Sequence, residues 1–512
     1  MSFEQLPLSE WSLSHLEAVV AIDSASDENS QSVPTTPGQT ELADFLVGFF
    51  SDLGIGNVER DGFSNVIFSV SGRGCGADKA PVALMIHLDT ARGTHAIQSL
   101  QVTRGWDGSA LSFANNPDIQ VSTQVYPTLA AYQGHDIVHG PGDAPFGLDD
   151  KLGLTHAMTL FKVLAAQPEL EHPPLIFVGR PDEEVGREEA LHAVAELLAQ
   201  RGVELGYTLD GLDPYEVNVE NFDAAGAWVR FVGSGLIPKG QGFTLRLGGV
   251  NTHGATAKAE GHRSAVRFAA EIRALCLARG IQARFVAFES DAERDCDATC
   301  LLVVQSGHGD ALWEAVREVV RPHMPRGASM ELAMGGDSPA EHGVDQALGW
   351  VHEFYGSTPG FVLAAEDSEG RQGYSAAYRL LPDKGGVRLD LRIRDFSDRG
   401  RKARVAHVEK HAGELPWDWR LQYDNMGPAL ADRPELTQSA LAASEKAGVK
   451  SQVQPIRGGT GVDPFLDKGL RIANLGTGYF APESEKELTS LQYMAGHVRW
   501  LVALMAELSA GS

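Results

Sequence analysis

Three short, mostly apolar runs, each followed within a few residues by side chains that can carry chemistry, constrain the fold of this chain more than any other feature. They span residues 81–86, 175–178 and 206–209. The first two are continuous apolar runs, which are typical of strands buried on both faces of a mostly parallel sheet. Helical patterns at 152–164 and 188–198 lie between them, so strand and helix alternate. This alternation predicts an α/β fold with a mostly parallel sheet.

The length of the chain indicates more than one domain. At 512 residues it exceeds what a single hydrophobic core supports. From about residue 220 the pattern changes to strand-rich segments with helices such as 264–277, and the α/β pattern returns near residue 427. We therefore expect an α/β domain formed by residues 1–219 and 427–512, interrupted by an inserted α+β domain at 220–426.

Composition and charge narrow the range of partners. The chain carries 43 basic and 68 acidic residues, which gives a formal net charge of −25. Such a charge repels a phosphate backbone, so we expect no nucleic-acid partner. No apolar run approaches the ~18 residues of a membrane span, and the first residues lack the basic stretch and apolar core of a signal peptide. We therefore expect a cytoplasmic protein without a membrane partner.

Acidic residues and one histidine follow the ends of the apolar runs. His87 and Asp89 follow the first run, Glu183 and Glu184 follow the second, and Asp210 follows the third. Open α/β sheets bind their ligands beyond the C-terminal ends of the strands. These side chains are therefore expected to lie close together.

A fourth acidic segment, Asp149 and Asp150, lies between two glycines just before the helical pattern at 152–164. Taken alone, aspartates at a helix start are typical of an N-cap. A His–Asp pair alone indicates a buried, paired histidine, and a Glu pair alone indicates a solvated surface. The four segments together instead predict a two-metal hydrolase site, because divalent cations stabilise concentrated negative charge.

The spacing within these segments indicates separate roles. Residues i and i+2 of a strand point to the same side, so Asp89 can accept the imidazole N–H of His87 and fix the tautomer that faces a metal. The side chains of Glu183 and Glu184 diverge, so that one can ligate a metal while the other reaches a bound water. A carboxylate beside such a water is the expected general base.

In order along the chain, these segments resemble the successive motifs of the peptidase T family of tripeptide aminopeptidases, which are co-catalytic dinuclear zinc metallopeptidases related to aminoacylase and carboxypeptidase G. The motifs recur in family order and cover most of the chain. They lie at residues 87–90, 147–153, 181–186, 207–211, 220–225, 251–258, 393–396 and 455–460. For the fold, the resemblance implies a zinc-peptidase α/β domain with an inserted lid domain of the dimerisation type.

The resemblance also implies a role for each acidic segment. His87 and Asp210 would bind one zinc ion, Asp149 would bridge both ions, and Glu184 would bind the second. Glu183 would be the general base that deprotonates the bridging water. The peptide bond between Asp149 and its successor would be cis, as in the family.

Four further residues are implied in substrate binding. His253 would donate a hydrogen bond to the oxyanion that forms at the substrate carbonyl. In related enzymes the partner subunit of a homodimer supplies this histidine. Asn251, Arg394 and Arg457 would bind substrate, the arginines through bidentate contacts to a carboxylate. For each arginine, a surface ion pair is the alternative.

One departure from the family concerns the second metal ion. Where the family has a histidine ligand, this chain has Pro482 and Glu483. Proline offers no side-chain donor, so we hypothesise that Glu483, or failing that Glu485, is the substitute ligand. An all-carboxylate site would tolerate manganese or cobalt in place of zinc. The alternative is a solvated acidic loop balanced by Lys486.

These inferences predict a metal-dependent peptidase that hydrolyses short peptides and removes the N-terminal residue. Two other functions stay open. One is a deacylase or carboxypeptidase acting on N-acyl amino acids, because related folds exchange these substrates through changes in the lid. The other is a catalytically silent peptide-binding homologue with a degenerate second metal site.

Overall fold

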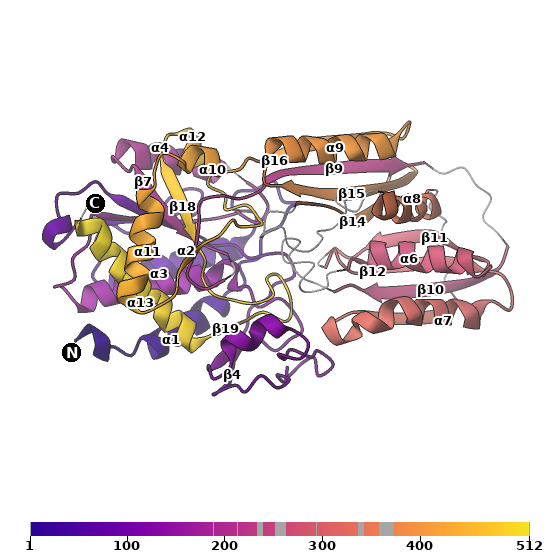
Figure 1. Cartoon of the computed structure of the whole chain (residues 1–512), viewed down its shortest axis with the longest axis horizontal. Coiled ribbons are helices and arrows are strands. Elements are labelled where there is room, and N and C mark those ends of the chain that lie inside the picture. The colour runs from indigo at the N-terminus through magenta and orange to yellow at the C-terminus, as the bar shows by residue number, and fades with distance from the viewer. Residues whose placement is uncertain are drawn as a thin grey trace. The chain divides into compact units, whose positions relative to one another are not determined.

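A computed structural model of the chain (Figure 1) describes residues 2–187, 189–211, 213–232, 239–250, 263–292, 294–335, 343–357 and 373–510. The chain forms two compact units. The first consists of Met1–Asn116, Pro127–Asn221 and Met426–Ser512, and the second of Pro117–Tyr126 and Phe222–Asn425. Among the described helices, none combines the length and apolar character that crossing a bilayer requires.

The first unit is built on an eight-stranded sheet with the strand order β1-β2-β6-β3-β7-β18-β8-β17. The strands are β1 (Glu59–Arg60), β2 (Val66–Val70), β3 (Val82–His87), β6 (Leu175–Arg180), β7 (Leu205–Leu209), β8 (Glu216–Asn218), β17 (Gln452–Val453) and β18 (Arg471–Leu475). The four central strands β6, β3, β7 and β18 run parallel to one another. The predicted α/β fold is therefore confirmed, although the sheet is mixed, because β2 and β8 pair antiparallel with their central neighbours.

Helices pack on this sheet and bury its central strands. They are α1 (Leu8–Val20), α2 (Pro37–Asp52), α3 (Leu148–Ala166), α4 (Glu189–Gln200), α10 (Gly427–Leu430), α11 (Glu435–Ala447), α12 (Asp463–Asp467) and α13 (Leu491–Ala510). Every residue of β3 and β6 is buried, as their apolar runs predict. Phe161 of α3 contacts Phe68 of β2 and Phe177 of β6, with ring centroids 4.9 and 5.9 Å apart. These contacts fix α3 against the sheet.

The sequence pattern at residues 487–508 predicts a closing helix, but α13 begins only at Leu491. Residues Leu488–Ser490 form β19 instead, which pairs antiparallel with β5 (Ile137–His139) in a small sheet that also contains β4 (Gln101–Thr103). The prediction was wrong here because pairing with a strand distant in sequence overrides the local helical pattern.

The second unit contains two four-stranded antiparallel sheets, β11-β12-β10-β13 and β14-β15-β9-β16. The strands are β9 (Asp223–Phe231), β10 (Gln241–Gly248), β11 (Ala283–Ser290), β12 (Ala298–Val304), β13 (Ser329–Met334), β14 (Tyr374–Asp383), β15 (Gly386–Asp395) and β16 (Trp417–Tyr423). The helices are α6 (Ala265–Ala278), α7 (Gly309–Val320), α8 (Val344–Ser357) and α9 (Asp398–Ala412). In Figure 1, α9 lies along β9 and β15.

Two buried histidines connect α3 and α13 to the chain that follows β18. The rings of His156 and His497 stack with centroids 4.1 Å apart. Nε2 of His156 lies 2.9 Å from the carbonyl oxygen of Thr477, and Nε2 of His497 lies 2.8 Å from that of Gly476. Burial lowers the pKa of His156 to about 4, and burial together with the charge of His156 lowers the pKa of His497 well below its ordinary value.

We expect this pair to make the protein sensitive to acid. Below the ordinary histidine pKa of 6.5 the unfolded chain takes up protons that the folded chain refuses, so the free energy of unfolding falls between about pH 6.5 and pH 4. His156 alone should contribute on the order of 3 kcal/mol. Urea unfolding at several pH values, with a chelator present, measures this. His156→Gln keeps a donor for Thr477 but cannot titrate in this range, and an acid dependence equal to that of the wild type would contradict the assignment.

Candidate metal centre

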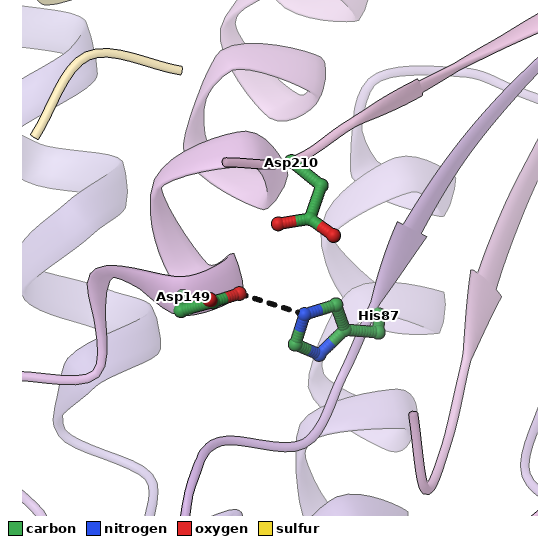
Figure 2. Close-up of side chains that lie close together, drawn as sticks. All are labelled: His87, Asp149 and Asp210. Carbon is green, nitrogen blue, oxygen red and sulfur yellow. Dashed lines mark hydrogen bonds and ion pairs between the residues drawn. The ribbon is translucent and has the colours of Figure 1, made fainter. Parts of the chain in front are cut away.

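Three of the predicted ligands converge at the C-terminal side of the sheet (Figure 2). His87 is the last residue of β3, Asp149 lies at the start of α3, and Asp210 directly follows β7. One ligand atom from each lies within 4.8 Å of the other two, and Nε2 of His87 is 2.9 Å from Oδ1 of Asp149. The ring and both carboxylates point toward one another in Figure 2.

The imidazole of His87 is held on its far side by Asp89. Its Nδ1 lies 3.0 Å from the carbonyl oxygen of Asp89 and 3.3 Å from Oδ1 of the same residue. With Nδ1 engaged there, Nε2 is the nitrogen that faces Asp149. The backbone N–H of His87 donates to Oδ2 of Asp150, which fixes the strand end beside the start of α3.

The loop before α3 presents Asp149 in a non-helical conformation. Asp149 and Asp150 depart from helical backbone angles, and the peptide bond between them is cis, as the resemblance implied. Gly147 adopts a left-handed conformation with φ of 79°. The amides of Gly147 and Leu148 donate to Oε2 of the buried Glu487 at 2.7 and 3.1 Å, so this carboxylate holds the loop.

A glycine lets α3 approach the end of β7. A Cβ on Gly153 would lie only 2.1 Å from the carbonyl oxygen of Leu209, so a larger residue would push the helix away. Asp210 is fixed in turn by β18, because its N–H donates to the carbonyl of Leu475 at 3.1 Å. Asn474 donates its side-chain amide to the carbonyl of Asp210 at 2.6 Å.

The turn after β6 carries Glu183 and Glu184, and Asp89 holds it. The carboxylate of Asp89 accepts the N–H of Glu183 at 2.9 Å and that of Glu184 at 3.1 Å. Asp182 anchors the same turn from the other side by accepting hydrogen bonds from Thr35 and Gln39. One buried atom, Oε1 of Glu184, has no hydrogen-bond partner among the described residues.

The electrostatics of this centre favour a bound cation. Burial raises the pKa of Asp210 and of Glu184 well above their ordinary values, and the charge of Asp149 raises both further. Burial also raises the pKa of Glu183. At His87 burial lowers the pKa, but hydrogen bonds to Asp149 and Asp89, together with the charges of Asp150 and Asp149, outweigh it and raise the pKa well above its ordinary value. The unpartnered oxygen of Glu184 and the excess of carboxylates therefore fit divalent metal ions.

The other two predicted ligands are not in the group of three. Among the described residues, that group contains neither Glu184 nor Glu483, although the charge of Glu483 contributes to the raised pKa of Glu184. Glu485 and Lys486 are buried, and Nζ of the lysine lies 3.3 Å from Oε1 of the glutamate. The alternative of a solvated acidic loop is therefore wrong for these two residues.

The predicted substrate-binding residues have varied surroundings. Arg394 lies on β15 of the second unit and donates to Oε1 of Gln422 at 2.7 Å and to the carbonyl of Ile393 at 2.9 Å. Arg457 lies half-buried between β17 and α12 of the first unit. Asn251 and His253 lie outside the described residues. Their roles stay predictions.

Two further residues near the centre, Tyr479 and Arg180, were not predicted from the sequence. Tyr479 donates its hydroxyl to Oδ2 of Asp149 at 3.0 Å. Arg180 is fully buried, donates to the carbonyl of Thr460 at 2.8 Å, and its charge lowers the pKa of Glu183. Arg180 is the last residue of β6, as His87 is of β3, and the two are register partners in neighbouring strands. A basic residue close behind an apolar run was therefore a signal that the sequence contained. The sequence around Tyr479 contains no such signal.

Comparison with known proteins finds relatives named peptidase T that match over nearly the whole chain. Peptidase T of Bacillus cereus is 32% identical over 498 residues, and peptidase T of Bacillus thuringiensis is 31% identical over 498 residues, each match covering 95% of both chains. The crystal structure of the aminopeptidase PepT from Bacillus cereus superposes with a TM-score of 0.52 at 15% identity, covering 98% of both chains, and thus has the same fold. No family model matches the chain.

We expect Gly153→Ala to disturb the centre through the backbone. The new Cβ forces α3 away from Leu209, which should lower the free energy of unfolding by about 1–3 kcal/mol and weaken divalent-metal binding by separating Asp149 from Asp210. Chemical unfolding and a metal titration measure the two effects. Gly48→Ala is the matched control, because a Cβ there, on α2, meets nothing within 4 Å. Unchanged metal affinity in Gly153→Ala would contradict the proposed role of this close approach.

Proposed function

The chain belongs to the peptidase T family, and from this premise we propose that it is a metal-dependent aminopeptidase that removes the N-terminal residue of tripeptides and other short peptides. The observation that carries the proposal is the convergence of His87, Asp149 and Asp210 from three separate elements. Such a group of one imidazole and two carboxylates is a typical ligand set for a hydrolytic divalent metal ion.

We assign the metal ligands as follows. His87, Asp149 and Asp210 would hold the first ion, and Asp149, Glu184 and Glu483 would hold the second. When bound, such ions polarise a carbonyl group and lower the pKa of water. We propose zinc, with manganese or cobalt as alternatives, because an oxygen-rich second position accepts these harder ions.

Glu183 is the proposed general base. Its backbone is fixed by Asp89, and, besides burial, the charges of His87 and Asp149 act on the pKa of its carboxyl group, which indicates that Glu183 lies near the centre. The carboxylate accepts a proton from the attacking water and returns it to the nitrogen of the leaving amine. Asp89 supports this transfer by holding both the turn that carries Glu183 and the ring of His87.

The remaining assignments complete the proposal. Residues 220–426 would form an inserted lid domain on a catalytic domain of residues 1–219 and 427–512. Within the lid, Asn251, His253 and Arg394 would contact the peptide, together with Arg457 of the catalytic domain. We further propose a cytoplasmic homodimer in which each subunit can supply His253 to its partner.

Replacing the proposed base should abolish turnover without emptying the site. In Glu183→Gln we expect kcat for a tripeptide to fall about 10²–10⁴-fold with metal content unchanged, because the amide cannot take up the proton. Steady-state kinetics and elemental analysis measure this. Glu189→Gln, at the exposed start of α4, is the matched control and should keep full activity.

A substrate panel accompanies this test, with tripeptides, dipeptides and N-acetyl amino acids, each with zinc, manganese and cobalt. A preference for N-acetyl amino acids would replace the aminopeptidase by a deacylase. Absence of turnover under every condition would indicate a binding protein.

Removing the proposed substitute ligand, Glu483, should prevent stable binding of the second metal ion. We expect Glu483→Ala to retain about one equivalent of metal where the wild type retains two, because the second position loses one of its three carboxylates. Elemental analysis after desalting gives the stoichiometry, and Glu445→Ala on the exposed face of α11 serves as the control. Two equivalents retained in Glu483→Ala would remove Glu483 from the ligand set.

A further inference from the structure

The two oxygens of the Asp149 carboxylate have different partners. Oδ1 lies 2.9 Å from Nε2 of His87, which belongs to the same group of three side chains. Oδ2 instead accepts a hydrogen bond of 3.0 Å from the hydroxyl of Tyr479. The tyrosine is nearly fully buried, with 2% of its surface exposed, so water does not compete strongly for this bond. At neutral pH a tyrosine hydroxyl is protonated and can donate.

The backbone around Tyr479 holds the hydroxyl in this place. Thr489 donates to the carbonyl of Gly478 at 2.6 Å, directly before the tyrosine. Directly after it, Phe480 and Leu488 exchange backbone hydrogen bonds of 2.9 and 3.3 Å. Leu488 and Thr489 belong to β19, which is itself paired with β5. These bonds fix the backbone on both sides of Tyr479, and the burial of its ring restricts rotation of the side chain away from Asp149.

A carboxylate that bridges two metal ions offers one oxygen to each. In this chain Oδ1 is the oxygen that lies beside His87, a proposed ligand of the first position, so we assign Oδ2 to the second position. Donation from a hydroxyl occupies one of the lone pairs of Oδ2 and withdraws electron density from it. Hydrogen bonds to charged groups are stronger than those between neutral groups, so this competition is significant.

We propose that Tyr479 is a positioning residue that orients Asp149 toward the first metal position and weakens the second, so that the two ions bind with unequal affinity. The inference rests on the dinuclear centre of the proposed function, but not on its substrate. It deepens that proposal because it assigns the asymmetry of the centre to one hydroxyl group of this chain.

The test is a metal titration of the chelator-treated full-length protein with cobalt, followed by visible absorption and by calorimetry. We expect the wild type to bind its second ion more weakly than its first. In Tyr479→Phe, which removes only the hydroxyl, we expect the ratio of the two dissociation constants to shrink by about tenfold. The absorption band of the second cobalt should then appear at lower total metal.

Tyr207→Phe is the matched control. Tyr207 is also buried, and its hydroxyl donates at 2.9 Å to the carbonyl of Leu436 rather than to a metal ligand. Both variants lose one buried hydrogen bond, but only Tyr479→Phe should change the ratio. Near-ultraviolet circular dichroism verifies that both are folded.

The outcomes separate this inference from the proposed function. An unchanged ratio in Tyr479→Phe, or a weaker second ion, overturns the inference even if the enzyme cleaves tripeptides normally. Binding of a single ion by both proteins also overturns it, because no second position then exists. A reduced ratio supports it even if no peptide in the panel is cleaved.

Discussion

The carboxylate of Asp89 is the contact on which the rest of the centre depends. It lies just past the end of β3 and accepts the backbone N–H groups of Glu183 and Glu184, which follow the neighbouring strand β6. Asp89 also holds the ring of His87. One buried carboxylate thus joins two strand ends and orients both a proposed metal ligand, His87, and the proposed base, Glu183. Hydrogen bonds to a buried charged group are among the stronger ones in proteins, which suits a carboxylate with this task.

Sequence patterns predicted the central strands well, for a physical reason. A strand buried on both faces needs apolar residues at every position, so β3 and β6 appear as uninterrupted runs, and the residues that follow them occupy the edge of the sheet where ligands bind. His87, Asp149 and Asp210 could therefore be expected together. The family membership inferred from the ordered motifs is confirmed by relatives that match over nearly the whole chain.

Contacts between distant segments could not be predicted in the same way. Tyr479 and Asp149 are 330 residues apart, and nothing near either residue indicates their hydrogen bond. The local sequence of strand β19 continues the pattern of the helix that follows it, whereas the pairing of β19 with β5 is a property of the folded chain. Glu487 likewise serves as acceptor for the loop before Asp149 only once that loop has been brought to it.

The paired backbone of Phe480 and Leu488 has a consequence for how such centres change in evolution. Their hydrogen bonds close the loop that carries residue 483, and they involve main-chain atoms only. Exchange of the side chain at 483 therefore leaves these two bonds intact. With Glu483 as a proposed ligand, a lineage can exchange one donor type for another at this position, and with it the preferred ion, while the paired backbone that closes the loop is kept.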